Sequence, residues 1–426
     1  MLNGLLTLRG AWDKVRVDPV LKFMVVAVTA YGMSTFEGPM LSLKNFNALA
    51  HYTDYIIAHV HVGGLGWNGF LTFGILYWMV PKMWNTKLYS TKLANFHFWI
   101  GSLGIVFYAL PMYASFFVQS LMWKEFTDAG LLAYPNFLET VRQIIPMYMI
   151  RAFGGLLYLT GAITMSYNLI KTAKQGSFMA EEAAEAPALE KKKITGGYWH
   201  RALERKPILF TVLSLVAILI GGVIEFVPTF LIKSNIPTIE AVKPYTPLEL
   251  HGRDIYIREG CNNCHSQMVR PFRSETVRYE GEYSKAGEFV YDHPFLWGSK
   301  RTGPDLHRVG GKYPDSWHYY HMMDPTTMSP GSLMPPYAWL LEQSIDLDKT
   351  EGKINAMRTL GVPYEEGYEK LANEDLMKQA EAIVESLKND EIEAVPEQEI
   401  VALIAYLQRL GTDIKVQDVV SENTKD

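Results

Sequence analysis

The chain has 426 residues, of which 48% are hydrophobic and only 20% are charged, so it is long enough for two or three domains and unusually apolar. A formal net charge of −5, with no basic stripe in the polar half, argues against nucleic acid as a partner. The long apolar runs lie in the first 170 residues and near 207–232. We therefore expect a membrane part followed by a water-soluble part.

Five segments are long and apolar enough to span a bilayer core, which takes about 20 apolar residues. We expect these spans at residues 20–45, 54–80, 95–121, 143–170 and 208–232. Lys and Arg gather in the N-terminal arm, in the loop after the second span and in the connection 171–206. Because cytoplasmic loops carry the excess of positive charge, these three regions are expected inside and everything after the fifth span outside.

Glu37 lies in "STFEGPM", in the outer half of the first expected span. Its depth matches that of His59 in the second span, so we expect the carboxylate to hydrogen-bond the imidazole and raise its basicity. The alternative interpretation is a helix end that is wetted by a cavity.

The second expected span contains "DYIIAHVHVGGLGWNGF", with His59 and His61 separated by one residue. Each helical residue turns by about 100°, so these two side chains point about 200° apart and cannot comfortably bind one metal. We expect them to serve two centres on opposite sides of the helix. Simple hydrogen bonding to neighbouring helices is the alternative, although ionisable residues inside a membrane are usually functional. Gly63, Gly64 and Gly66 would let a planar cofactor or another helix come close.

The connection 171–206 contains "AEEAAEAPALEKKK", whose mixture of acids, alanines and bases predicts a solvated linker or a surface helix. Beyond residue 245, short helices between Pro and Gly breaks are expected. Near the end, one further helix is predicted to be stopped by Gly411, with one apolar face formed by Ile400, Leu403, Ile404 and Leu407.

The run Cys261-Asn-Asn-Cys264-His265 is the attachment signature of c-type haem. Two thiols close to one turn apart add to the two haem vinyl groups, and the adjacent histidine then points at the iron. A redox dithiol is the competing interpretation. A zinc site would need a second cysteine pair, and the chain has only two cysteines.

A haem that transfers electrons at high potential favours a soft sixth ligand, usually methionine. Met334 in "GSLMPPY" is the candidate, because prolines would fix the loop that presents it, although a methionine in such a loop is more often a packing residue. Met268 follows His265 by three residues and cannot reach the opposite face of the iron. The nearby rivals are Met322, Met323 and Met328.

These motifs together resemble a fusion of two subunits of the cbb3-type cytochrome c oxidases, the C-family of the haem-copper oxidases. Residues 1 to 170 resemble the last four spans of the catalytic subunit, through "GMSTFEGPM", "ALAHYTDYIIAHVHVGGLGW" and "FYALPMYASFF". Residues from 200 to the end resemble the membrane-anchored mono-haem cytochrome c subunit, through "GCNNCHSQMVRPFRSETVRYEGEYSKAGEFVYDHPFLWGSKRTGPDLHRVGGKY" and "SLMPPYAWL".

The resemblance implies that His59 is the proximal ligand of the high-spin haem b of the oxygen-reducing centre. It implies that His61 is one axial ligand of the low-spin haem b. Glu37 corresponds to a family glutamate near the proximal histidine, which makes His59 and Glu37 the candidate catalytic residues.

For the soluble half, the resemblance implies that Cys261 and Cys264 hold haem c covalently, with His265 and Met334 as axial ligands of its iron.

The resemblance also leaves a gap. The family's catalytic subunit has further spans, and its three copper-binding histidines and its active-site tyrosine precede the part seen here. His51 and His97 are the only other histidines in residues 1–170, too few for a copper site, and the second ligand of the low-spin haem is not seen either. We therefore expect either the downstream piece of a split or truncated gene, or a chain that completes its sites with a separate partner and cannot reduce oxygen alone.

The expected fold is all-α, with about five membrane helices followed by a periplasmic class I-like cytochrome c domain. The expected parts are four membrane helices in 1–170, a cytoplasmic linker in 171–206, an anchor helix in 207–232, the mono-haem cytochrome c domain in 245–415 and a tail in 416–426.

The expected function is that of a component of a proton-translocating terminal oxidase in the bacterial inner membrane. Electrons would enter at haem c and pass through haem b to the haem-copper centre, where oxygen becomes water. The alternatives are an anchored electron-transfer cytochrome c without oxidase activity, and a subunit like that of nitric oxide reductase.

The implied cofactors are one covalent haem c, two haems b shared with a missing N-terminal part or a partner, and copper supplied by that part. The implied partners are membrane lipid, the rest of the catalytic subunit, a further cytochrome c subunit, and a donor cytochrome or quinol-oxidising complex.

Overall fold

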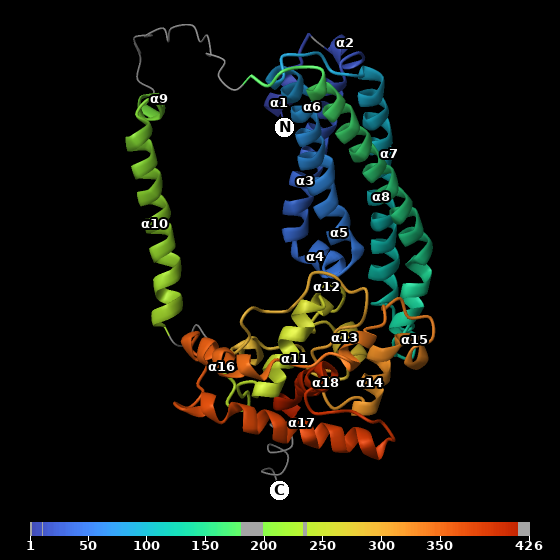
Figure 1. Cartoon of the computed structure of the whole chain (residues 1–426), viewed down its shortest axis with the longest axis vertical. Coiled ribbons are helices and arrows are strands. Elements are labelled where there is room, and N and C mark those ends of the chain that lie inside the picture. The colour runs from blue at the N-terminus through green and yellow to red at the C-terminus, as the bar shows by residue number, and fades with distance from the viewer. Residues whose placement is uncertain (1, 11, 180–198, 233–236, 416–426) are drawn as a thin grey trace. The chain divides into compact units, whose positions relative to one another are not determined.

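The computed structural model describes residues 2–10, 12–179, 199–232 and 237–415. Over these ranges the chain forms helices and loops without a β-strand, so the all-α fold class is confirmed for this part (Figure 1). The chain divides into two compact units. One comprises residues 1–180, 243–284 and 291–426, and the other comprises 181–242 and 285–290.

Four helices of the described chain are long and apolar enough to cross a membrane. They are α3 (Pro19–Ser42), α7 (Thr91–Met122), α8 (Phe137–Lys174) and α10 (Pro207–Leu231). They match the first, third, fourth and fifth expected spans, with ends shifted by a few residues. The starts follow from local chemistry: the side chain of Asp18 caps the N-terminus of α3, and that of Asn136 caps α8.

The second expected span is helical but is not one uninterrupted α-helix, so it is not among the four helices that are each long enough to cross a membrane alone. It consists of three consecutive helical pieces, α5 (Asp54–His61), the π-helical segment η1 (Val62–Gly69) and α6 (Phe70–Met83). The glycines allow close packing in this segment, because a Cβ on Gly66 would lie only 3.0 Å from the Cβ of Ala30 on α3. Short π segments inside helices are rare and frequently mark functional sites. This one begins directly after His61.

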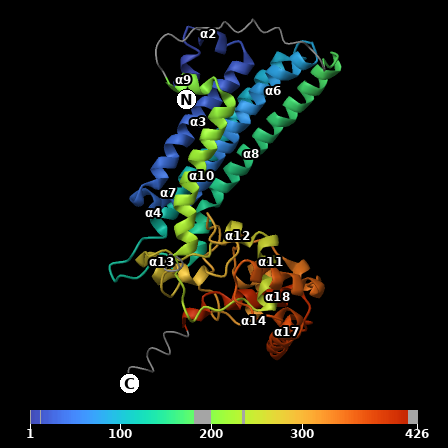
Figure 2. The ribbon, with the colours of Figure 1, turned by 90° about the vertical axis from the view of Figure 1, so that its left-hand side faces the viewer.

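The remaining helices at this end are α1 (Leu2–Leu6), α2 (Trp12–Val15) and α4 (Lys44–Ala50). In the bundle, α7 and α8 pack along each other (Figures 1 and 2). Helix α3 packs on η1 and α6. Small residues permit the closest crossing, since a Cβ on Gly154 of α8 would lie 2.7 Å from the backbone of Phe107 on α7.

The C-terminal part of the same unit is a set of shorter helices. They are α11 (Pro247–Arg258), α12 (Cys261–Cys264), α13 (Arg273–Arg278), α14 (Asp315–Met323), α15 (Pro325–Met328), α16 (Thr350–Thr359), α17 (Ala372–Asn389) and α18 (Glu399–Arg409), with 3-10 turns η4 (Ala338–Leu341), η5 (Leu347–Lys349) and η6 (Tyr368–Lys370). The predicted helix is present as α18, and Ile400, Leu403, Ile404 and Leu407 are buried. All residues from Glu399 to Leu407 are buried, however, so the helix is covered on all sides and not on one face alone. Gly411, the residue predicted to end this helix, has a positive φ of 70°.

Arginines of this C-terminal part bind the loops at the ends of the membrane helices. Arg301 is buried, pairs with Glu275 at 3.0 Å and with Asp305 at 3.3 Å, and lies over the ring of Tyr52 at 4.2 Å. Its backbone N–H donates to the carbonyl oxygen of Tyr52 at 2.9 Å. Arg278 donates to carbonyl oxygens in the loop between α7 and α8. Charge and backbone hydrogen bonding therefore hold the segment around residue 300 against the start of α5.

The second unit contains α9 (Trp199–Glu204), α10 and the 3-10 turn η3 (Ala286–Phe289). Much of the expected linker, residues 180–198, lies outside the described residues, as does the expected tail 416–426.

Candidate functional site

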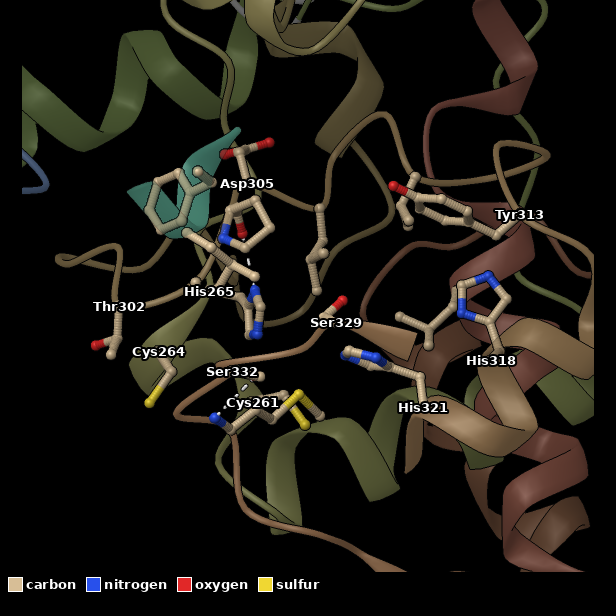
Figure 3. Close-up of a pocket in the computed structure, with 18 of the residues that line it drawn as sticks. Cys261, Cys264, His265, Thr302, Asp305, Tyr313, His318, His321, Ser329 and Ser332 are labelled. Atoms are coloured by element: carbon tan, nitrogen blue, oxygen red, sulfur yellow. Dashed lines mark hydrogen bonds between the residues drawn. The ribbon is translucent and has the colours of Figure 1, made fainter. Parts of the chain in front are cut away.

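The two cysteines stand at the two ends of α12, a single helical turn that follows Gly260 with φ 71°. They form no disulfide, and both line a cavity of about 380 Å³ (Figure 3). That volume is in the range of natural small-molecule and cofactor sites. The first turn of α8, through Phe137 and Leu138, contributes apolar side chains to the same cavity.

His265 presents its ring to this cavity (Figure 3). Its Nδ1 donates to the carbonyl oxygen of Pro304 at 2.8 Å, which fixes the tautomer and leaves Nε2 unprotonated. Burial lowers the pKa of His265, so the imidazole is neutral at pH 7. A neutral imidazole with a hydrogen-bonded Nδ1 is the form that ligates a metal, so the residues present fit a haem iron.

Gly303 leaves the space that the His265 ring occupies, because a Cβ at this position would collide with three atoms of the ring. For a haem attached at this turn, Gly303→Ala is therefore expected to displace the ring and to weaken its hold on the iron by about tenfold or more, which should lower the yield of attached haem. Haem staining of the denatured chain on a gel measures this. Gly352→Ala on α16 is the matched control, since a Cβ there meets no atom, and it should leave the stain unchanged. Full staining of the Gly303→Ala chain would contradict this role.

Among the methionine candidates, Met334 and its rival Met322 line the cavity, whereas Met323 and Met328 do not. Met322 is buried in the apolar core of the C-terminal part. Met334 is only partly buried and lies in the loop after α15, where its backbone N–H is bound by the hydroxyl of Ser332 at 3.1 Å. The cavity thus leaves two of the four candidates for the sixth ligand.

Two histidines of α14 that the sequence interpretation passed over also line the cavity. In Figure 3 the ring of His321 points into the space that His265 faces. Burial, assisted by His265, lowers the pKa of His321 to about 4, and burial lowers that of His318 to about 4. Nε2 of His318 and Nδ1 of His321 are buried without a hydrogen-bond partner in the described structure. The stretch "DSWHYYHMM" could have indicated these two residues, because its histidines are three residues apart and so lie on the same side of a helix.

The expected hydrogen bond between Glu37 and His59 is present. Nδ1 of His59 lies 3.1 Å from Oε2 of Glu37, and Glu37 is buried although it belongs to a membrane helix. The other carboxylate oxygen accepts a hydrogen bond from the hydroxyl of Tyr113 on α7. This leaves Nε2 of His59 for a ligand. Sequence interpretation missed Tyr113, although it stands in the quoted stretch "FYALPMYASFF".

His61 has different neighbours. Its Nδ1 donates to the carbonyl oxygen of Ile57 at 2.8 Å, one turn earlier, so its Nε2 is also left for a ligand. Its ring stacks on Tyr108 of α7, with centroids 4.5 Å apart. His59 and His61 share no hydrogen-bond partner in the described structure, which suits ligands of two separate centres.

The two further histidines of the membrane part lie elsewhere. His97 is fully buried on α7, with Nδ1 3.1 Å from the hydroxyl of Tyr77. His51 packs edge-on against Tyr52 at 4.2 Å. Over the described ranges, no group of three or more His, Cys, Asp and Glu side chains is placed to hold a metal ion.

Two family models match the chain. The model described as "Cytochrome C oxidase, mono-heme subunit/FixO" matches residues 200–414, about half of the chain. The model described as "Cytochrome C and Quinol oxidase polypeptide I" matches residues 1–157. The first match covers α12 and most of the residues that line its cavity, and the second covers His59 and His61.

Curated relatives match the N-terminal part. A bacteroid cytochrome c oxidase subunit 1 homologue of Bradyrhizobium diazoefficiens is 57% identical over 177 residues, 41% of this chain and 32% of the relative. Subunit 1 of Rhodobacter capsulatus is 50% identical over 44% of this chain and 35% of the relative. The cbb3-type subunit CcoN1 of Stutzerimonas stutzeri is 43% identical over 43% of this chain and 39% of the relative.

The chain thus spans about a third of the length of these relatives, and the mono-haem family model covers the other half of the chain. From the haem-attachment motif, the histidine pair and these two matches, the chain belongs to the mono-haem subunit/FixO family of the cbb3-type cytochrome c oxidases and carries, in the same polypeptide, a part of the catalytic subunit 1.

Proposed function

We propose that the chain is the electron-transferring component of a cbb3-type terminal oxidase, taking electrons at a covalent haem c and passing them through haem b to the oxygen-reducing haem-copper centre. One observation carries the proposal: a single unit of the fold holds the haem-attachment turn in a cavity and two membrane histidines whose Nδ1 atoms are both engaged. The haems supply the one-electron chemistry when bound, and oxygen reduction to water consumes four electrons and four protons.

In the soluble half, Cys261 and Cys264 would each form a thioether with the haem c vinyl groups. His265 would ligate the iron through Nε2, oriented by its hydrogen bond to Pro304. Met334 would be the sixth ligand, because it lies in a loop at the cavity rather than in the apolar core. A soft thioether favours the reduced iron and so a high potential, which suits an electron donor to haem b.

In the membrane half, His59 would ligate the high-spin haem b and His61 the low-spin haem b. Because both histidines lie on α5, this one helix would hold both haems. We propose that the copper ligands and the second ligand of the low-spin haem lie in the remainder of the catalytic subunit, since the relatives are about three times as long as the matched part.

We place the protein in the bacterial inner membrane, with the cytochrome c part in the periplasm, because Lys and Arg gather in the connections on the other side. The assembled oxidase would include a further cytochrome c subunit, and a donor cytochrome or a quinol-oxidising complex would supply electrons. The parts would be four membrane helices in residues 1–170, the linker 171–206, the anchor 207–232 and the cytochrome c domain 245–415.

The carbon monoxide difference spectrum of membranes that contain the assembled protein tests this function. An oxidase component predicts a CO-reactive high-spin haem b together with haem c. A plain electron carrier predicts haem c alone, so normal haem c without CO-reactive haem b would refute the proposal.

Glu37 would act as a positioning residue through His59. Its negative charge beside the Nδ1–H group increases the electron density that the imidazole would give to the iron, and this stabilises the oxidised iron. Glu37→Gln should therefore raise the reduction potential of the high-spin haem. We expect about a tenfold change in the reduction equilibrium, or 59 mV for one electron, and about 10- to 100-fold slower turnover.

A redox titration of the CO-reactive haem measures this shift. Glu37→Asp should restore part of the wild-type potential, and Tyr113→Phe, which retains the Glu37 to His59 hydrogen bond, should shift it less. A wild-type potential in the Glu37→Gln enzyme would show that the carboxylate has only a packing role.

A further inference from the structure

The Met334 loop, residues 329–337, is built around a tight turn at the edge of the cavity (Figure 3). The backbone N–H of Ser332 donates to the carbonyl oxygen of Ser329 at 3.0 Å and closes a four-residue turn. Gly331 is its third residue and has φ 89°, the positive value that a type II turn requires there. The hydroxyl of Ser332 then accepts the N–H of Met334 at 3.1 Å. The turn and the methionine are therefore one connected piece.

Arg142 of α8 contacts this turn from outside the loop. Its Nη2 donates to the carbonyl oxygen of Pro330 at 2.6 Å. A Cβ on Gly331 would lie 2.8 Å from Nη2 and 3.0 Å from Nε of Arg142, so the guanidinium lies directly across the glycine. In the described structure, the other hydrogen bonds of residues 329–334 stay within the loop and α15. The position of this exposed turn thus depends on the guanidinium.

The part of α8 that carries Arg142 is well packed. Val141 is 3% exposed and belongs to a buried apolar cluster with Tyr52, Trp123 and Phe137. Phe137 and Val141 also line the cavity that contains the haem-attachment turn. Arg142 therefore ties an exposed loop on one side of the cavity to a buried wall on another side.

The contact joins the two halves of the chain. Arg142 lies in the segment that the subunit 1 model matches, residues 1–157, and Pro330 lies in the segment that the mono-haem model matches, residues 200–414. A hydrogen bond from a charged guanidinium is stronger than one between neutral groups. The catalytic-subunit part thus acts directly on the loop that presents the proposed sixth ligand of haem c.

We infer that Arg142 positions Met334 on the iron of haem c, so that the catalytic-subunit part of the chain sets the ligation and the reduction potential of haem c. This inference rests on the proposed function, because it requires a covalent haem c with Met334 as its sixth ligand. A methionine ligand raises the potential of a haem, since its soft sulfur binds ferrous iron better than ferric iron. A loop released at Pro330 would let the sulfur leave the ferric iron more often, and the potential would fall.

Absorption spectra and a redox titration of haem c in the purified oxidase test this positioning role. Wild-type ferric haem c should show the methionine-to-iron charge-transfer band at the red end of the spectrum. Arg142→Leu keeps an apolar stem but no N–H donor, and should lose at least half of this band. Its midpoint potential should fall by about a tenfold change in the reduction equilibrium, or 59 mV for one electron. Arg142→Lys keeps a charged donor and should give intermediate values.

Arg273→Leu is the matched control. Arg273 of α13 also joins the two halves of the chain through one arginine-to-carbonyl hydrogen bond, which it donates to Gly130 at 3.0 Å in the loop between α7 and α8. Neither residue lines the cavity. The substitution removes a comparable contact but leaves the Met334 loop untouched, so the band and the potential should keep their wild-type values.

A wild-type band and potential in Arg142→Leu would overturn the inference. An equal loss in Arg273→Leu would overturn it too, because docking in general would then control the ligation. If Arg142→Leu does not assemble, Arg142→Lys decides: the inference requires an assembled oxidase with a weaker band, and a wild-type band there contradicts it. Absence of covalent haem c, or of the methionine band, from the wild-type enzyme would instead refute the proposed function or its assignment of Met334.

Discussion

Replacing His59 by Ala is expected to abolish CO binding and oxygen consumption by the assembled oxidase, while the haem c spectrum stays normal. The reason is geometric: the carboxylate of Glu37 holds Nδ1 of His59 at 3.1 Å, so the free Nε2 is the atom that can bind the high-spin iron. CO difference spectra and an oxygen electrode on the same membranes measure both effects.

His61→Ala is the matched variant, two residues along the same helix. It should remove the low-spin haem b bands but leave a CO-reactive haem, because its imidazole has its own partners in Ile57 and Tyr108. Loss of the CO signal in His61→Ala together with its survival in His59→Ala would reverse the assignment of the two histidines.

Replacing both Cys261 and Cys264 by Ala is expected to remove all covalently bound haem from the chain. Each thioether needs one of these sulfurs, and no other cysteine exists in the sequence. Haem staining after denaturing electrophoresis measures the loss, which should be complete in the double variant and should leave the CO-reactive haem b in place. Cys264→Ala alone should retain some stain through Cys261. A haem-staining band from the double variant would contradict covalent attachment at this turn.

The same double variant should no longer accept electrons from the donor cytochrome. Oxygen uptake driven by a reduced donor cytochrome should fall to background, whereas an artificial reductant that reaches haem b directly should still support uptake. Equal loss with both reductants would mean that the substitutions damage the membrane half as well.

Local spacing explains what could be predicted from the sequence. The haem-attachment turn and the histidine pair are each read from a few consecutive residues, and the presence of helix α18 follows from its 3.6-residue period. The Glu37 to His59 hydrogen bond was also predicted, since the depths of two residues in neighbouring spans can be estimated from the rise per residue.

The features that sequence interpretation missed depend on packing between distant segments. The π-helical segment after His61 lies where Gly66 packs closely on α3, and hydrophobic periodicity does not encode such an approach. Likewise, Met322 remains beside Met334 as a cavity residue because α14 and the following loop meet there.

Electron backflow after CO photolysis tests the central claim most directly. In the partly reduced, CO-bound oxidase, photolysis lowers the potential of the high-spin haem, so electrons should flow to the low-spin haem b and then to haem c. The account predicts that wild type shows both steps, and that His61→Ala shows CO recombination without any photo-induced reduction of haem c. Unchanged reduction of haem c in His61→Ala would contradict an electron path through the haem that His61 holds.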